Sequence, residues 1–322
     1  MSIYDVIEAQ RKALLDRDAA YLATVAGQWR GVEQALQSRS LVLANQVAAL
    51  EASGQVVSPA RLARLERYLS LAKQARSVIR GFAGDMAPGV VEQQQLAFDQ
   101  GIRDAGAQLN SAGVAGSFNR LPVGATNVII GTAADGSPLR ALLEAQWPSA
   151  VDAMTRALIR NTALGVNPRV TAREMAASSG AALSRMMTVA RTETLRAYKE
   201  STRATFKEVG ITKYKRIAAK NARTCVLCLS LDGQIYDVDQ IMPQHPNCRC
   251  ALLAIVDGYN FPKRETGADW FDNQTPVIQR QMLGAGRYEL YRRGKVTLDD
   301  LISFFDDPTW GPQVRATPLE NL

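Results

Sequence analysis

The first 112 residues have the hydrophobic spacing of amphipathic helices. Residues 4–50 consist of good helix formers without proline, which predicts helix almost throughout. A second helix is predicted to begin at Pro59, because proline suits the first helical position, and a third to follow Pro88. In the second helix, apolar side chains recur every three or four residues, at Leu62, Leu65, Leu69, Ala72 and Ile79. The region 1–112 is therefore predicted to form a helical arm or bundle.

The pattern changes between residues 113 and 137, where glycines punctuate a short apolar stretch. This segment is predicted to be a linker or a small β element, with a domain boundary near its end. Helical spacing resumes over 138–163, breaks at the Gly-Val-Asn-Pro of 165–168 and continues over 181–209. The glycines of the segment are Gly113, Gly116, Gly124, Gly131 and Gly136.

The C-terminal part of the chain, up to residue 310, is too apolar for a free tail. The run Thr297-Leu-Asp-Asp300 resembles a helix start. A helical lobe is predicted over 261–310, whereas 311–322, with two prolines, are expected to form a flexible tail. The large apolar side chains of the lobe are Trp270, Leu283, Tyr288, Leu290, Leu301, Phe304, Phe305 and Trp310.

Composition narrows the class of protein. Hydrophobic residues make up 47% and charged residues 21% of the 322, which is ordinary for a globular protein of two or three domains. The longest apolar run, Ala251–Val256, is far shorter than the roughly 20 residues that span a bilayer. No basic segment precedes an apolar stretch at the N-terminus, so no secretory signal is expected. These features argue against a membrane-spanning or exported protein.

The formal charge of +7 is concentrated in one basic stretch, residues 196–223. Nine cationic side chains stand there against Glu200 and Glu208, with Tyr198 and Tyr214 interleaved. Such density is typical of a surface that neutralises phosphates, but also of a solvated helix face, and the spacing alone leaves both interpretations open. The nine are Arg196, Lys199, Arg203, Lys207, Lys213, Lys215, Arg216, Lys220 and Arg223.

All four cysteines and the only histidine lie between residues 225 and 250. Cys225-Val-Leu-Cys228 has the spacing of a metal-binding knuckle, and His245, Cys248 and Cys250 supply the second half of a tetrahedral zinc site. Five candidates compete for four positions. If residues 248–250 are extended, both of their thiols face the same side and His245 is left outside the ligand set; otherwise one cysteine drops out.

Other uses of the cluster are weaker. A disulfide needs an oxidising compartment, and a thioredoxin-like CxxC needs a βαβ context. A histidine-rich zinc nuclease needs histidines that this chain lacks. Because thiolate-rich zinc sites are mostly closed and structural, we expect structural zinc and no catalytic residues.

Four motifs together resemble the phage head morphogenesis domain, the family of minor head proteins of phage Mu and SPP1-like phages. They are Ala190-Arg-Thr-Glu193, Arg223-Thr-Cys-Val-Leu-Cys228, Leu231-Asp-Gly233 and His245-Pro-Asn-Cys-Arg-Cys250. Their order and spacing match over residues 165–256, and the N-terminal 130 residues match only in being helical. The resemblance places the domain at 138–260, with a zinc module at about 221–256, and gives Arg191, Thr192 and Glu193 no chemistry.

The resemblance implies a structural protein of a phage or prophage virion. Members of the family join the procapsid in few copies, associate with the portal and in some phages act on the passage of the genome at ejection. The portal protein is thus the expected partner, with a capsid or scaffolding protein and genomic DNA as further candidates and no membrane. The expected location is the capsid interior near the portal, and the host cytoplasm during assembly.

The predicted fold is mainly α, with an extended helical N-terminal region, a small α+β module stapled by zinc and a helical C-terminal lobe. The first alternative function is a zinc-containing DNA-binding protein that uses the basic stretch 196–223. A metal-dependent hydrolase is the second, and it requires an open zinc position that holds a water.

Overall fold

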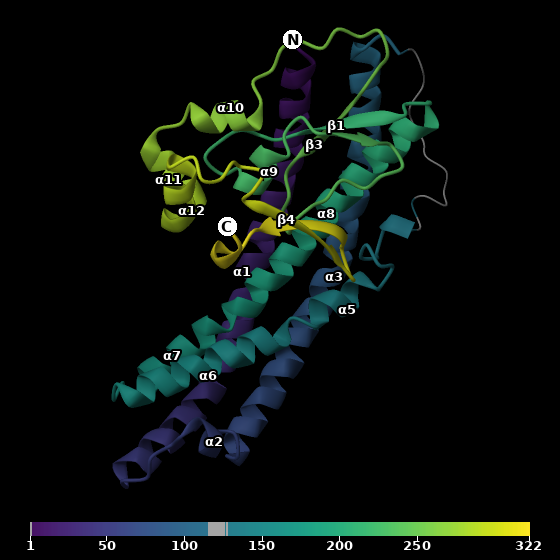
Figure 1. Cartoon of the computed structure of the whole chain (residues 1–322). Helices are drawn as coiled ribbons and strands as arrows, with labels where there is room; N and C mark the ends of the chain where they lie inside the picture. The colour runs from purple at the N-terminus through teal and green to yellow at the C-terminus, as the bar shows by residue number, and fades with distance from the viewer. Residues whose placement is uncertain (1, 115–125, 127) are drawn as a thin grey trace. The chain divides into compact units, whose positions relative to one another are not determined.

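The computed structural model describes residues 2–114, 126 and 128–322. The fold is mainly α, as predicted, with two small sheets (Figure 1). Most of the first half of the predicted 113–137 linker, residues 115–125 and 127, lies outside the described residues. Within them, no helix is both long enough and apolar enough to cross a membrane.

The N-terminal region forms long helices. Helix α1 (Ile3–Ala52) is continuous, and short α2 (Pro59–Leu62) begins after the side-chain cap of Ser58. The expected break at Pro88 is wrong, because this proline lies inside α3 (Glu66–Ser111). Pro88 is flanked by the buried Met86, Ala87 and Val90, and their burial offsets the roughly 3 kcal/mol that an internal proline costs.

The middle of the chain is helical as well. The elements are α5 (Leu139–Glu144), α6 (Trp147–Ala163), α7 (Pro168–Ser178) and α8 (Gly180–Glu208). Gly165, at φ +64°, ends the turn after α6, and the Asn167 side chain accepts a hydrogen bond from Arg169 N at the start of α7. The break predicted at 165–168 and the helix predicted over 181–209 are therefore confirmed.

A three-stranded antiparallel sheet follows α8. Its strands are β1 (Lys213–Ile217), β2 (Ile235–Asp237) and β3 (Ala251–Ala254), in the order β2-β1-β3, and α9 (Val226–Ser230) lies in the β1–β2 connection. In β1 the side chains of Tyr214 and Arg216 are fully buried, whereas Lys213 is exposed. The alternation fixes which side of the strand faces the cysteine-bearing segments.

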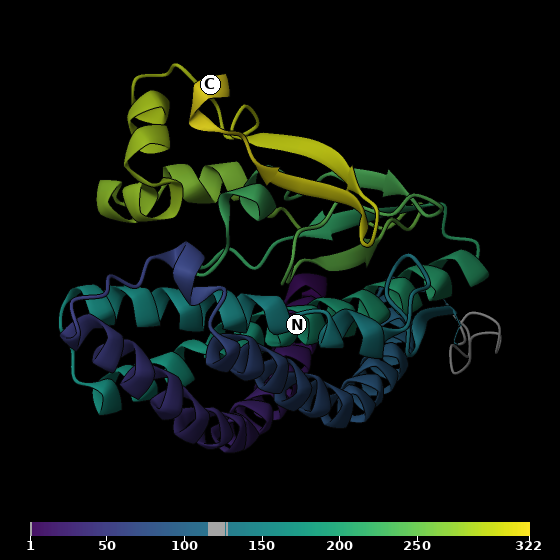
Figure 2. The same ribbon diagram turned by 90° about the horizontal axis from the view of Figure 1, so that it is seen from below.

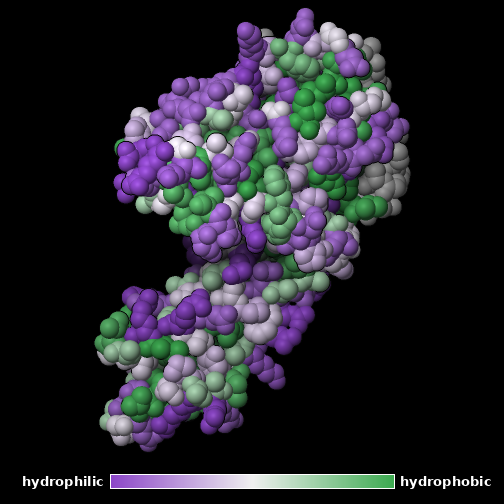
Figure 3. All heavy atoms as spheres, in the orientation of Figure 1, coloured by the Kyte–Doolittle hydropathy of each residue, from purple (hydrophilic) through white to green (hydrophobic). Residues whose placement is uncertain are grey.

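The C-terminal lobe is only partly helical. It contains α10 (Gly267–Asp272), α11 (Pro276–Leu283) and α12 (Ala285–Arg292), and hydrophilic side chains gather over α11 and α12 (Figure 3). The lobe then continues as an antiparallel hairpin of β4 (Ile302–Asp307) and β5 (Gly311–Ala316), before a short 3-10 turn η1 (Leu319–Asn321). Phe271 and Leu301 are fully buried in the core of the lobe.

The hairpin corrects two expectations, that the lobe is helical over 261–310 and that 311–322 form a flexible tail. Thr297 caps only a single turn, through hydrogen bonds with Asp300, and no helix follows. Aromatic residues favour a strand at Phe304 and Phe305, and Gly311 adopts the positive φ of +68° that the tight turn requires. Figure 2 shows the hairpin beside the three-stranded sheet.

Residue contacts divide the chain into two units whose boundaries fall inside α1, α3 and α8. One unit consists of Asp18–Val91 and Pro138–Arg191 and is helical. In its core, the rings of Trp29 and Phe82 meet edge to face at 4.9 Å. The other unit consists of Met1–Arg17, Glu92–Ser137 and Thr192–Leu322 and contains both sheets and all the cysteines.

In the sheet-bearing unit, α3 and α8 approach each other closely at Gly101. A Cβ atom there would lie 2.0 Å from Ser201 Oγ and 2.5 Å from the carbonyl oxygen of Tyr198. We therefore expect Gly101→Ala to destabilise the protein by about 1–3 kcal/mol, because the helices must separate. Gly81→Ala, in the same helix with nothing within 4 Å of its added Cβ, should stabilise it by roughly 0.5–1 kcal/mol. Urea unfolding of both variants tests the contact, and a Gly101→Ala variant as stable as Gly81→Ala would contradict it.

Candidate metal centre

Two short segments of the sheet-bearing unit, 225–228 and 245–250, position the five candidate ligands. Cys225 is the residue before α9, in an extended conformation, and Cys228 lies in the first turn of that helix. His245, Cys248 and Cys250 lie in the loop that leads into β3. Asn247 has a φ of +63°, and Cys248 N donates a hydrogen bond to the carbonyl of His245. This turn places the side chains of His245 and Cys248 on the side of the loop that faces Cys225 and Cys228.

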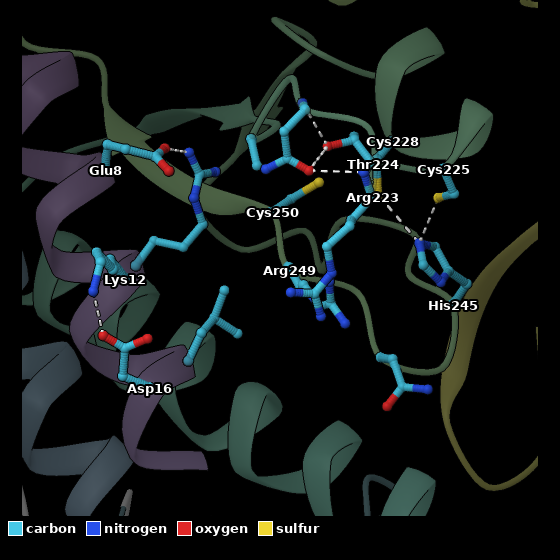
Figure 4. Close-up of a pocket in the computed structure, with 15 residues that line it drawn as sticks. Glu8, Lys12, Asp16, Arg223, Thr224, Cys225, Cys228, His245, Arg249 and Cys250 are labelled. Atoms are coloured by element: carbon cyan, nitrogen blue, oxygen red, sulfur yellow. Dashed lines mark hydrogen bonds and ion pairs between the residues drawn. The ribbon is translucent and has the colours of Figure 1, made fainter. Parts of the chain in front are cut away.

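The five side chains form two overlapping groups that share Cys228. Figure 4 shows Cys225, Cys228, His245 and Cys250. His245 Nε2 lies 3.2 Å from Cys225 Sγ and 3.1 Å from Cys228 Sγ. Cys228 Sγ also lies 4.0 Å from Cys248 Sγ, and Cys250 belongs to the same group. Within each group the donor atoms lie within 4.8 Å of one another, and all four cysteines are free.

The orientation of His245 suits a metal ligand. Its Nδ1 is 2.8 Å from the carbonyl oxygen of Pro246, which can only accept a hydrogen bond. The proton of the neutral ring therefore lies on Nδ1, and the lone pair of Nε2 faces the thiols of Cys225 and Cys228.

The cysteines and the histidine shift each other's ionisation. A hydrogen bond from Cys228 lowers the pKa of Cys225. Burial opposes this effect, but the adjacent His245 adds to it, and the pKa falls to about 4. Burial disfavours the charged imidazole, but hydrogen bonds with the thiols of Cys225 and Cys248 outweigh it and raise the pKa of His245 to about 10. Since the thiolate is the form of cysteine that binds metals, the site favours the binding form of Cys225. The raised pKa of His245 keeps a proton on Nε2, which a metal ion must displace in order to bind there.

Arg216 is a fully buried cation in contact with the cluster. Its Nη2 donates to Cys248 Sγ at 3.4 Å and to Cys228 Sγ at 3.5 Å, and its Nη1 donates to the carbonyl of Pro243 at 2.6 Å. Burial alone lowers the pKa of Arg216, but the thiols of Cys250, Cys248 and Cys228 reverse this and raise it. A buried guanidinium needs negative charge beside it, so its position indicates that the cluster carries thiolates.

Lys199 supports the loop from α8. It is buried, and its Nζ lies 2.7 Å from both the carbonyl oxygen of Cys248 and Gln244 Oε1. The loop is also held by the C-terminal hairpin, because Gln244 N donates to the carbonyl of Pro312 and Val314 N donates to the carbonyl of Gln244. Gln244, the residue before His245, is thus held by both α8 and the C-terminal hairpin, which are distant from it in the sequence.

The triplet 191–193 is part of the same framework. Thr192 Oγ1 accepts a hydrogen bond from Asn247 N in the ligand loop. Glu193 is fully buried, pairs with Arg196 at 2.6 Å and accepts a hydrogen bond from Trp310 Nε1 at 3.0 Å. These contacts are structural, and burial raises the pKa of the Glu193 carboxyl although Arg196 opposes it.

The Leu231-Asp-Gly233 motif shapes the return from α9 to β2. Gly233 adopts a φ of +88°, which permits the tight turn, and its N donates to the carbonyl of Arg216. Asp232 Oδ1 accepts from Ala218 N, and Oδ2 pairs with Arg264 at 2.6 Å. The motif thereby anchors β1 beside the cluster.

The nine cations of the stretch 196–223 do not share one surface. Lys199 and Arg216 are buried, and the side chains of Arg196 and Arg203 are 12% and 19% exposed and pair with Glu193 and Glu200. Four others have separate surroundings: Lys207 pairs with Asp239, Lys215 lies over Phe261, Lys220 donates to the backbone carbonyl of Glu265 and Lys213 is exposed on β1. Arg223 is exposed and lies beside the cluster. DNA binding by the stretch stays a prediction.

Sequence reasoning missed the supporting residues Arg216, Lys199, Gln244 and Trp310. For Arg216 a signal existed, since the period of two along β1 places it on the side of Tyr214, opposite the exposed Lys213. The other three are fixed by contacts between distant segments, for which the local pattern gives no signal.

The donor set fits a metal ion, since soft thiolates and an imidazole nitrogen at these separations can surround one. Residues 152–253 match the family described as phage Mu protein F like proteins, and the match includes all five candidate ligands and the triplet 191–193. No curated protein and no solved structure matches the chain. Residues 152–253 thus form a domain of the phage Mu protein F like family, a family of phage head proteins.

Proposed function

We propose that this protein is a minor head protein of a phage or prophage that acts structurally in head assembly at the portal. The observation that carries the proposal is the family match over 152–253, the segment that contains the whole cysteine and histidine cluster. In this role the protein resides in the capsid interior near the portal after assembly in the host cytoplasm. It has no catalytic activity of its own, and a capsid or scaffolding protein and the genomic DNA are further partners.

The proposed cofactor is one structural zinc ion held by four of Cys225, Cys228, His245, Cys248 and Cys250. Zinc is supported by the predominance of sulfur donors and by the burial of Cys228, Cys248 and Cys250. The ion joins α9 to the loop before β3, two short segments that come from different parts of the chain. Metal binding there contributes directly to the stability of the fold.

Co-expression with the portal protein encoded nearby tests the role in assembly. We expect the two proteins to co-elute on a sizing column, with about one zinc per chain by elemental analysis. The control replaces the portal with an unrelated ring-shaped oligomer, with which no co-elution is expected. Separate elution of a zinc-loaded, folded chain from its portal would contradict the assembly role, and a folded chain without metal would contradict the zinc site.

A further inference from the structure

A cavity of about 340 Å³ opens beside the cluster in the sheet-bearing unit. One wall is the N-terminal part of α1, from Glu8 to Asp16, and the other is formed by the loops 219–225 and 245–250 (Figure 4). Four of the five candidate ligands, Cys225, Cys228, His245 and Cys250, also line the cavity. The charged side chains of the two walls add a second set of polar groups to it.

The two walls differ in charge. On α1, Arg11 pairs with Glu8, and Lys12 pairs with Asp16 at 2.6 Å, so that this wall is neutral as a whole. Both carboxylates that line the cavity belong to this wall. The loop wall contributes Arg223 and Arg249, whose side chains both point into the cavity (Figure 4). Among the described residues, the guanidinium of Arg223 has no hydrogen-bond or ion-pair partner.

We infer that this cavity binds a phosphate group between Arg223 and Arg249. Guanidinium groups donate paired hydrogen bonds that match phosphate oxygens, and two of them from separate loops can surround a tetrahedral anion. A carboxylate is planar and is satisfied by one such fork, so two converging arginines favour phosphate. The amides of Asn221 and Asn247 also line the loop wall and add neutral donors. This inference does not depend on the role in head assembly.

Two sources can present the group, the backbone of DNA or free inorganic phosphate, and they are distinguished by direct binding. The zinc-loaded full chain is titrated with a fluorescent DNA oligonucleotide at several salt concentrations and, separately, with inorganic phosphate in a calorimeter. Arg223→Gln and Arg249→Gln are the test variants, and Lys213→Gln is the matched control, since Lys213 is an exposed cation that does not line the cavity. Zinc content is measured for each variant, because both arginines neighbour candidate ligands.

If the source is DNA, each test variant weakens oligonucleotide binding about tenfold or more and lowers the salt slope by roughly 1, whereas Lys213→Gln has little effect. If the source is free phosphate, the test variants abolish the calorimetric signal and the oligonucleotide does not bind. A loss in Lys213→Gln equal to that in the arginine variants would overturn the inference in favour of a diffuse basic surface. Absence of binding to both probes by a zinc-loaded chain would overturn it as well.

Discussion

Cys228→Ser is expected to lose the metal and to unfold the sheet-bearing unit around it. Cys228 belongs to both groups of candidate ligands, so its thiol lies within 4.8 Å of the donor atoms of all four other candidates. Structural zinc contributes on the order of 10 kcal/mol to such modules, and loss of a shared ligand should remove several kcal/mol of it. Elemental analysis and thermal unfolding, with and without a chelator, measure both effects.

Ser230→Ala is the matched control, since Ser230 lies in the same helix and bonds Asp299 instead of the cluster. It should retain zinc and lose at most about 1 kcal/mol. A Cys228→Ser protein that is soluble, protease-resistant and as stable as the wild type would refute the structural metal. Comparing Cys225→Ser with Cys250→Ser then tests whether either cysteine is outside the set, because a variant that keeps a full complement of zinc identifies a residue that is not a ligand.

Arg216→Met should weaken both the fold and the affinity for zinc. The substitution removes a fully buried cation that donates to Cys228 and Cys248, and the thiolates lose their buried partner. Breaking a buried pair in this way costs about 3–5 kcal/mol. Arg216→Lys keeps the charge but cannot reproduce the fork, so an intermediate loss is expected. Urea unfolding measures the stability, and competition with a chromophoric chelator at fixed pH measures the affinity.

The control for Arg216 is its neighbour Lys215, which lies over the ring of Phe261 on the other side of β1. Lys215→Met should cost about 0.5–1 kcal/mol and leave the affinity for zinc unchanged. If Arg216→Met bound zinc as tightly as Lys215→Met, the guanidinium would not be the partner of the thiolates.

The helices were predictable because their signals are local. The proline-free run 4–50 and the break at 165–168 each mark an element without any knowledge of tertiary contacts. Pro88 shows where this fails, because its helix-breaking signal is overridden by the burial of Met86 and Val90 around it. The β4–β5 hairpin was missed for the opposite reason. Its short apolar run fits helix and strand alike, and β5 is also held by hydrogen bonds with the distant Gln244.

The candidate ligands were also predictable, because residue type and spacing point to metal chemistry directly. The charged residues that surround the candidate ligands could not be predicted from the sequence. Lys199 and Arg216 appeared in a basic stretch and were interpreted as a surface, yet both are buried against the ligand loop. Whether a basic residue is exposed or is buried beside a negative charge can be decided only when its neighbours from other segments are known.

The β4–β5 hairpin also determines how late in synthesis the ligand loop can gain its final contacts. Gln244, next to His245, bonds Pro312 and Val314, and Trp310 bonds Glu193. At the other end of the chain, Arg11 donates to the carbonyl of Ile217. Because synthesis proceeds from the N-terminus, the ligand loop waits for its last supports until almost the whole chain has been made. Contacts between segments so far apart in the sequence form slowly. The cysteines therefore stay outside their final surroundings until late in folding, and whether they bind a metal then depends on its supply.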